Sequence, residues 1–295
     1  MGLFDVKSVA IVGASPKEEK VGNIILNNFL KIFKGKIFAV NPNYKEISGI
    51  PCYPSVKDIP EDVDMVVIAI PAKSVPQVIK DSVEKGVKLA IIISAGFSET
   101  GEEGKKLEEE IINIAKGKLR IIGPNGLGVY DPYNGIDTFF VREEKVPRPP
   151  KGKIAILSQS GAIALALMEW LALHNIGVSK IISYGNKIDI DEIDLLYELK
   201  DDPNTKCVFM YIEGLKEKRG REFLKAAEEF IKARKIIVAL KAGKTKRGQS
   251  AVSSHTASLA GDYEVYEFAF KEVGIIEAKN MEDLLIYLRT ISYFI

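Results

Sequence analysis

Hydrophobic positions in this chain form short runs that alternate with amphipathic segments. The runs are rich in valine and isoleucine and lack a regular polar alternation, which is typical of strands buried on both faces of a sheet. We expect strands at 8–12, 37–40, 65–70, 89–94, 120–122, 153–157, 180–184, 207–212 and 236–240. The segments between them follow a helical spacing, and we expect helices at 22–33, 74–85, 102–115, 162–175 and 221–233.

This alternation of strand and helix predicts parallel sheets with right-handed crossovers. It occurs twice and is interrupted once, by the charged and proline-rich stretch 142–152. Prolines remove hydrogen-bond donors and block helix formation, so we expect one unit to end here before the next begins. The pattern therefore predicts two doubly wound α/β domains, residues 1–147 and 148–295.

Composition and charge narrow the class of protein. The 295 residues are 46% hydrophobic, and 41 Lys and Arg against 40 Asp and Glu leave a formal net charge of +1. This balance argues against binding nucleic acid through bulk charge. Cys52 and Cys207 are too few and too distant for a disulfide framework or a zinc site. Neither a secretion signal nor an apolar stretch of about 20 residues is evident, so we expect a cytoplasmic protein without a membrane partner.

A nucleotide-type cradle is expected where the first strand ends. Residues 9–15 run from the strand into a tight turn at Gly13, and Gly22 then opens a helix whose backbone amides could meet a phosphate. The G-x-G-x-x-G fingerprint is incomplete, because Ala14 and Ser15 follow Gly13. Asn41 stands where an NAD site uses an acid. Both departures count against NAD, and the alternative that Gly13 only fits the turn stays open.

Small residues also end the third, fourth and fifth expected strands. They occupy 71–72, 94–96 and 123–126. Ligands of open parallel sheets bind beyond the carboxyl ends of the strands, so these small residues leave room for an extended ligand. Lys17, Lys20 and Lys45 are candidates to meet its phosphates.

His255 is the main catalytic candidate of the second half. It is one of two histidines and lies in a loop of small residues, 243–261, between a strand and a helix. Loops of this length are usually functional or disordered, and a flexible carrier of a nucleophilic imidazole suits covalent catalysis. His174 lies instead at a helix end, where the helix dipole alone favours a histidine.

Two further groups could act with His255. Glu213 directly follows the strand 207–212, and a carboxylate at this end could fix the tautomer of an imidazole. The alternative is a solvated loop acid. Ser160 and Gly161 join a strand to a helix and could form a phosphate cradle, the alternative being a plain N-cap with Ser160 in that role.

Together these motifs resemble the α subunit, or α-like half, of the nucleoside-diphosphate-forming acyl-CoA synthetases. This group includes succinyl-CoA synthetase and the ADP-forming acetate–CoA ligases. The stretches that carry the resemblance are 9–15, 41–43, 94–98, 123–125, 157–162, 185–191 and 253–261. The resemblance implies a Rossmann-like CoA-binding domain followed by a flavodoxin-like, doubly wound ligase domain.

The resemblance also implies roles for individual residues. His255 would be transiently phosphorylated, Glu213 would steady it, and Ser160 and Gly161 would bind phosphate. The implied CoA contacts are Gly13, Ser15, Pro16, Lys17, Glu18, Lys45, Pro71, Ala72, Ile93, Ser94, Ala95, Gly96 and Asn125. Leu165 stands where succinate-specific members carry a tyrosine, which favours a small or apolar acid over succinate.

The implied activity interconverts acyl-CoA, ADP and phosphate with a carboxylate, ATP and CoA, through an acyl phosphate and a phosphohistidine. The only stretch resembling a P-loop, 243–245, lacks the required glycine at Val238. We therefore expect ATP or ADP and Mg²⁺ on an ATP-grasp β subunit, in a hetero-oligomer. Asp189, Asp191, Glu192 and Asp194 fall on a loop and a helix start, and we expect a solvated first turn there rather than a metal site.

Two other classes of function remain to be weighed. A non-catalytic CoA-binding sensor could use the same fold, although it would have no reason to assemble Glu213, Ser160 and the His255 loop. An NAD(P)-dependent oxidoreductase is disfavoured by Asn41 and by the incomplete glycine fingerprint.

Overall fold

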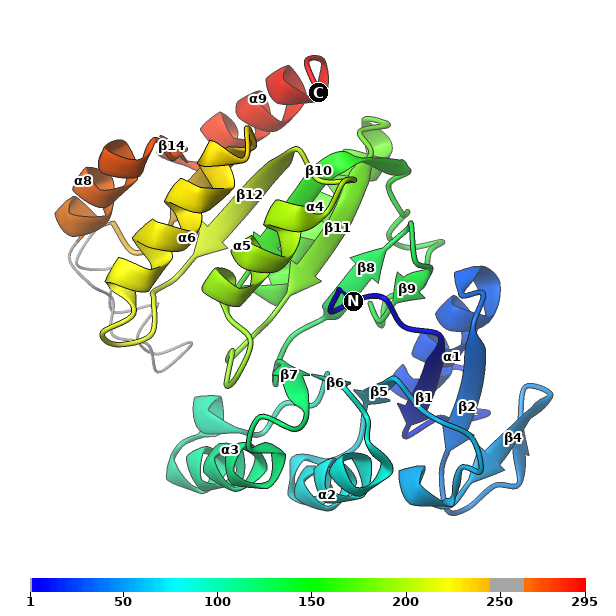
Figure 1. Ribbon diagram of the computed structural model, residues 1–295. Coiled ribbons are helices and arrows are strands. Elements are labelled where there is room, and N and C mark those ends of the chain that lie inside the picture. Colours follow the sequence, from blue (N-terminus) through cyan, green and yellow to red (C-terminus); the bar gives the residue numbers. More distant parts are fainter. Residues whose placement is uncertain (1, 245–262) are drawn as a thin grey trace. The chain divides into compact units, whose positions relative to one another are not determined.

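The computed structural model describes residues 2–244 and 263–295, which form two units of strands and helices (Figure 1). Unit 1 comprises Met1–Lys145 and Tyr184–Ile190, and unit 2 comprises Val146–Ser183 and Asp191–Ile295. Tyr184–Ile190 thus belongs to unit 1, although its neighbours in the chain on both sides belong to unit 2. Both units are built on mainly parallel sheets, which confirms the expected α/β fold.

Unit 1 is built on a sheet with the strand order β3-β4-β2-β1-β5-β6-β7. All of its pairs are parallel except β3–β4. Helices α2 and α3 pack against one another. The elements are β1 (Ser8–Val12), α1 (Val21–Ile32), β2 (Lys36–Val40), β3 (Glu46–Ile47), β4 (Ile50–Tyr53), β5 (Met65–Ile68), α2 (Val75–Lys85), β6 (Leu89–Ile92), α3 (Glu102–Ala115), β7 (Arg120–Ile122), and the antiparallel pair β8 (Gly128–Asp131) and β9 (Ile136–Asp137).

Unit 2 is built on parallel strands in the order β14-β13-β12-β10-β11. Helix α4 packs on β10 and β11, and α5 packs against α6 (Figure 1). The elements are β10 (Lys151–Ser158), α4 (Gly161–Leu173), β11 (Val178–Ser183), α5 (Glu192–Asp201), β12 (Cys207–Ile212), α6 (Gly220–Lys232), β13 (Ile236–Lys241), α8 (Tyr263–Val273), β14 (Ile276–Glu277) and α9 (Met281–Ser292).

The central strands are buried on both faces, as their unbroken apolar runs predicted. Every residue of β1, β5 and β6 is buried, and Ile11 pairs with Ala39 on one side and with Val67 on the other. On α1 the apolar residues Ile25, Leu26 and Phe29 are fully buried. Removing this much apolar surface from water at about 25 cal/mol per Å² is the main force that holds each helix on its sheet.

The short hairpin β3–β4 was not expected from the sequence. Its two-residue turn consists of Ser48 and Gly49, both with positive φ (53° and 77°), as a tight hairpin turn requires. Strands β5 and β6 also end two residues earlier than predicted. Beyond them the Ser94 hydroxyl accepts from the backbone N–H of Ile70 at 3.2 Å and donates to its carbonyl oxygen at 2.5 Å, so a side chain bonds the backbone there.

Candidate active site

The turn after β1 is shaped by two glycines. Gly13 has a φ of +90°, and a Cβ there would lie 2.4 Å from the carbonyl oxygen of Ala69. A Cβ on Gly22 would lie 1.9 Å from the carbonyl oxygen of Gly13, so the start of α1 packs directly on the turn. A larger residue at either position would have to displace backbone atoms. The packing of the chain itself therefore requires both glycines.

Asn41 joins the end of β2 to this turn. Its Nδ2 donates to the carbonyl oxygen of Ala14 at 2.8 Å, and its Oδ1 accepts from the backbone N–H of Asn43 at 3.0 Å. This position lies at the edge of the sheet where open parallel sheets bind their ligands. An amide engaged in this way offers no carboxylate to a ribose hydroxyl, which agrees with the argument against NAD.

Two cavities of unit 1 are each lined by some of the predicted CoA-binding residues. A cavity of about 560 Å³ opens at the carboxyl ends of β1, β2 and β5, and Gly13 is among its lining residues. A second cavity, of about 540 Å³, is lined by Pro16, Glu18, Arg142 and residues of α1. The structure thus brings Gly13 to the first cavity, and Pro16 and Glu18 to the second.

The turn between the two cavities is fixed by its own hydrogen bonds. The buried Ser15 hydroxyl accepts from the backbone N–H of Lys17 at 3.1 Å, and the Ser15 carbonyl oxygen accepts from Asn23 Nδ2 at 2.8 Å. Several expected CoA contacts have exposed side chains: Pro16, Lys17, Glu18, Lys45, Pro71 and Ala95. They are accessible to a ligand without rearrangement.

The segment after β6 brings together another part of the predicted site. The backbone N–H of Asn125 donates to the carbonyl oxygen of Ser94 at 3.0 Å. A Cβ on Gly96 would lie 3.3 Å from the Cβ of Ala72. Four of the predicted CoA residues, Ala72, Ser94, Gly96 and Asn125, therefore meet from the three segments that follow β5, β6 and β7, while Ile93 is buried at the strand end.

Asn186 is a further candidate for a functional role. No role was expected for this residue from the sequence. Its Nδ2 donates to Glu99 Oε2 and to Glu108 Oε1, both at 2.7 Å. The other oxygen of Glu99 accepts from the backbone N–H of Gly96 at 2.6 Å. Glu99 therefore links Asn186 to Gly96, one of the predicted CoA contacts. The stretch 185–191, which contains Asn186, contributed to the family resemblance, but nothing in this stretch indicates that Asn186 binds Glu99 and Glu108.

The two carboxylates of this cluster are shifted in opposite directions. Burial would raise the pKa of Glu99, but hydrogen bonds from Asn186, Gly96 and Phe97 outweigh it, and the pKa falls below its ordinary value. Burial raises the pKa of Glu108, and its hydrogen bonds from Asn186 and others do not offset this effect. Glu108 is therefore the member of the pair that takes up a proton more readily.

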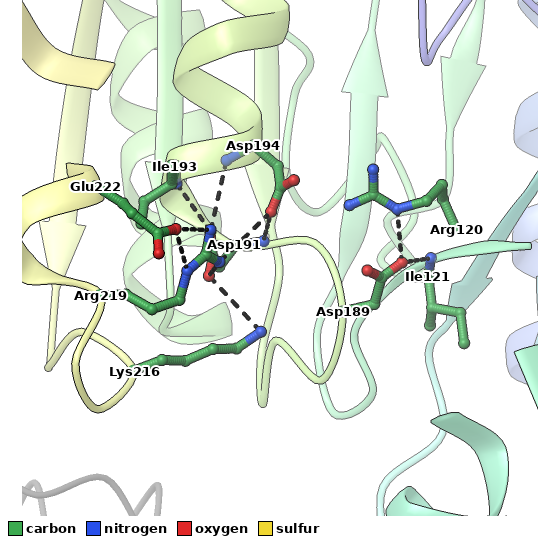
Figure 2. Close-up of polar contacts among 9 residues, drawn as sticks. All are labelled: Arg120, Ile121, Asp189, Asp191, Ile193, Asp194, Lys216, Arg219 and Glu222. Carbon is green, nitrogen blue, oxygen red and sulfur yellow. Dashed lines mark hydrogen bonds and ion pairs between the residues drawn. The ribbon is translucent and has the colours of Figure 1, made fainter. Parts of the chain in front are cut away.

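The segment Tyr184–Ile190 is held in unit 1 by a ladder of backbone bonds. The N–H of Ile188 donates to the carbonyl oxygen of Gly123 at 3.1 Å, and the N–H of Ile190 donates to that of Ile121 at 3.0 Å. Asp189 Oδ2 accepts from Arg120 Nε at 2.9 Å and from the N–H of Ile121 at 2.7 Å (Figure 2). Most of the motif 185–191 thus packs against β7 as part of unit 1, and only Asp191 belongs to unit 2.

In unit 2, Ser160 and Glu213 follow the carboxyl ends of the adjacent parallel strands β10 and β12. Ser160 is the N-cap of α4, and its hydroxyl accepts from the N–H of Ile163 at 3.4 Å. The N–H of Ser160 donates to the Ser158 hydroxyl at 3.2 Å. The capping role of Ser160 is therefore present, and Gly161 begins the helix, where the N–H groups and the positive end of the dipole point outward.

Glu213 is buried, with 4% of its surface exposed, and is not the solvated loop acid of the alternative reading. Its backbone N–H donates to Gln159 Oε1 at 2.6 Å, and the N–H of Gly214 donates to the same oxygen at 3.1 Å. Burial raises the pKa of the neighbouring Tyr211, and the negative charge of Glu213 raises it further. Gln159 thus ties the end of β12 to the turn that precedes α4.

Our expectation of a solvated start for α5 was wrong for Asp191 and Glu192, both of which are fully buried. Asp191 caps the helix, accepting from the N–H of Ile193 at 3.0 Å. Its carboxylate also pairs with the guanidinium of Arg219 and lies 3.6 Å from Lys216 Nζ (Figure 2). The acid is buried because two cations from the loop after Glu213 fold over it, a contact that the sequence did not disclose.

His255 lies outside the described residues, as do residues 245–262 in general. Within residues 2–244 and 263–295, no group of three His, Cys, Asp or Glu side chains is arranged to hold a metal ion. No helix in that part of the chain has the length and apolar character needed to cross a membrane. Cys52 and Cys207 are both buried free thiols.

Two family models match the chain in the order of the two units. Residues 7–132 match a CoA binding domain, and residues 151–291 match a succinyl-CoA ligase like flavodoxin domain. These matches confirm the predicted order of a CoA-binding domain and a flavodoxin-like ligase domain.

The chain is also similar to whole proteins. It is 47% identical to acetate–CoA ligase [ADP-forming] I of Archaeoglobus fulgidus over 96% of this chain and 40% of that one. It is 44% identical to the α subunit of acetate–CoA ligase [ADP-forming] I of Pyrococcus furiosus over 98% of this chain and 63% of that one. The chain thus spans between two-fifths and two-thirds of the length of these relatives.

A solved structure agrees with this picture. It is the dinucleotide forming acetyl-coenzyme A synthetase 1 of Candidatus Korarchaeum cryptofilum, in complex with phosphate and ADP. The identity is 41%, the TM-score is 0.93, and the match covers 99% of this chain and 62% of that one. The chain belongs to the family of ADP-forming acyl-CoA synthetases and corresponds to their α subunit or α-like half.

Proposed function

We propose that this chain is the acyl-transfer and phosphohistidine part of an ADP-forming acid–CoA ligase. The observation that carries the proposal is the gathering of Ser160, Gly161, Glu213 and the start of the His255 loop at the carboxyl ends of β10, β12 and β13. Active sites of open parallel sheets lie at this edge. A sensor that only bound CoA in unit 1 would have no use for such a second site.

The reaction proceeds in three balanced transfers. Phosphate attacks the acyl carbon of acyl-CoA, the C–S bond breaks, and an acyl phosphate and CoA result. The imidazole of His255 then attacks the phosphorus, the bond between phosphorus and the acyl oxygen breaks, and the carboxylate leaves. Finally ADP takes the phosphoryl group from His255, which gives ATP and the free histidine. A covalent intermediate divides one difficult transfer into two in-line steps.

Each predicted residue has a role in this scheme. Glu213 orients the imidazole of His255 by accepting from one ring nitrogen, so that the other is the nucleophile. Ser160 and Gly161 present the start of α4 to the phosphate. CoA binds in unit 1, at the turn after β1 and at the segment containing Ser94, where both strand ends and exposed side chains are accessible.

The nucleotide is proposed to bind on a second polypeptide or domain. The described residues offer no acidic cluster for a phosphate-bound metal, and the longer relatives have room for a further module. We infer an ATP-grasp β subunit that holds ATP or ADP with Mg²⁺, in a cytoplasmic hetero-oligomer. The two free thiols agree with a reducing compartment.

A small monocarboxylic acid is the proposed substrate. Related proteins are named for acetate and, at 37% identity, for 4-hydroxybutyrate. Leu165, on α4, replaces the tyrosine of succinate-specific members and removes a polar partner for a second carboxylate. A substrate screen that preferred succinate to acetate would contradict this assignment.

The test is phosphorylation of the chain by radiolabelled ATP in the presence of the ATP-grasp subunit. We expect an acid-labile, base-stable label that disappears in His255→Ala. The chain has one other histidine, so His174→Ala is a matched control that should keep the label. A label that survives His255→Ala, or binding of CoA with no phosphorylation at all, would reject the proposal, and the latter result would favour the sensor.

A further inference from the structure

Lys241, the last residue of β13, is a lysine buried in unit 2, with 1% of its surface exposed. Its Nζ donates to the carbonyl oxygen of Glu213 at 2.9 Å and to that of Ala242 at 2.5 Å. The same ammonium lies 4.8 Å from the centroid of the Tyr266 ring. Burial of an ammonium is costly unless such contacts compensate it, so Lys241 is firmly tied to these neighbours.

The peptide groups around Glu213 are therefore fixed from several elements. Gln159 accepts from the Glu213 N–H, and Lys241 donates to the Glu213 carbonyl oxygen. Two residues further on, the hydroxyl of Tyr266 accepts from the N–H of Leu215 at 3.0 Å. A hydrogen bond from a charged donor is stronger than one between neutral groups, so the bond from Lys241 should hold the Glu213 carbonyl oxygen more strongly than a neutral donor would.

We propose that Lys241 is a positioning residue for phosphoryl transfer, which holds the Glu213 peptide and the start of the segment leading to His255. The proposal rests on the proposed function, in which Glu213 orients His255. Lys241 is suited to this role because Ala242, whose carbonyl oxygen it binds, begins the stretch that joins β13 to the histidine loop. The Lys241 ammonium thus binds the backbone of Glu213 and that of Ala242, the residue from which the chain continues toward His255.

The chain contains a matched control at the other end of β13. Lys235 is also buried, and its Nζ donates to the carbonyl oxygens of Leu199 and Asp202, both at 2.7 Å. It lies 5.7 Å from the centroid of the Phe230 ring. Lys235→Met therefore removes the same kind of buried ammonium, with two carbonyl partners and one ring, without touching Glu213.

The experiment measures the single-turnover rate of phosphohistidine formation from radiolabelled ATP, using the full chain with its ATP-grasp subunit. Because a displacement of about 1 Å can cost about 100-fold in rate, we expect Lys241→Met to slow the reaction about 10- to 100-fold at saturating ATP. The KM for ATP and the affinity for CoA should not change. Lys235→Met should leave the rate unchanged, although both variants lose stability.

A double-mutant cycle separates positioning from a general loss of structure. If Lys241 acts through Glu213, Lys241→Met should slow the Glu213→Gln variant far less than it slows the wild type. Additive losses, or an unchanged rate in folded Lys241→Met, would overturn the proposal. Should Lys241→Met fail to fold, Lys241→Leu, which also lacks an N–H donor, is judged by the same criteria. A wild-type chain that forms no phosphohistidine would reject the proposed function itself, and the role of Lys241 with it.

Discussion

Replacing Asp191 with alanine should remove two contributions of one buried carboxylate. Asp191 caps α5, and loss of an N-cap costs about 1 kcal/mol. It also pairs with Arg219 and Lys216, whose side chains are 28% and 31% exposed. Water can reach these cations after the substitution, so losing the pair adds about 1 kcal/mol rather than the larger cost of a fully buried pair. We expect the free energy of unfolding of unit 2 to fall by about 2 kcal/mol in total.

Two companion variants separate the cap from the charge. Asp191→Asn keeps a side-chain oxygen, and asparagine caps helices as well as aspartate does, so this variant should lose only about 1 kcal/mol. Glu222→Gln removes an exposed partner of the same Arg219 guanidinium, with a side chain 59% exposed, and should cost less than about 0.5 kcal/mol.

Urea unfolding followed by the fluorescence of Trp170 measures these differences. Trp170 is the only tryptophan and lies on α4, so it reports unit 2 even if the two units unfold separately. With a slope of about 2 kcal/mol per M, the alanine variant should lower the midpoint by about 1 M urea. Equal losses in the alanine and asparagine variants, or an alanine variant within about 0.5 kcal/mol of the wild type, would refute this reasoning.

Three further predictions concern single side chains. Asn41→Asp should weaken CoA binding about tenfold or more, because a carboxylate cannot donate to the Ala14 carbonyl oxygen and repels phosphate. Titration calorimetry measures this change, and an unchanged affinity would contradict the prediction. Burial alone would raise the pKa of Asp202, but its bonds from Lys180 and others lower it. The stability that Asp202 contributes should therefore be lost as pH falls below about 4. Asp202→Asn should lower the free energy of unfolding of unit 2 by about 1–3 kcal/mol at pH 7. In unfolding monitored by tryptophan fluorescence, this variant should also lose less stability in acid than the wild type does. The pKa of Glu108 is raised by burial, so its favourable contribution is present in acid and lost as pH rises through its folded pKa. Glu108→Gln should leave unfolding by circular dichroism unchanged in acid and raise stability at pH 7, and a loss at pH 7 would show that this sign is wrong.

The local pattern of the sequence was enough to locate the longer strands of both sheets. The expected bounds of β1, β7, β12 and α3 match the structure residue for residue. This success has a physical reason, since strands buried on both faces need continuous apolar runs, and a helix against a sheet needs apolar residues at helical spacing. Short elements without a strong pattern, such as β3, β4, β8, β9 and β14, were missed.

The sequence also located the candidate chemistry, through residue types placed at strand ends. Gly13, Ser94 and Glu213 were each found because parallel strands place their carboxyl ends at one edge of a sheet. Yet the burial of Glu213 could not be read from its charged surroundings. Gln159 and Lys241, which come from two other strand ends, bind the backbone of Glu213.

The tertiary structure alone decided which polar groups meet. Asn186 lies 78 residues from Glu108 along the chain, and Arg219 lies 28 residues from Asp191, so no local spacing could pair them. From the sequence alone, a carboxylate in a charged stretch is expected to be solvated. Asp191 is buried instead, because Arg219 and Lys216 pair with it. The sequence by itself thus determined the layers, the strand ends and the reactive residue types, because these follow from local burial. The fold decided the partners of each charge, because only packing brings distant groups close enough to replace water.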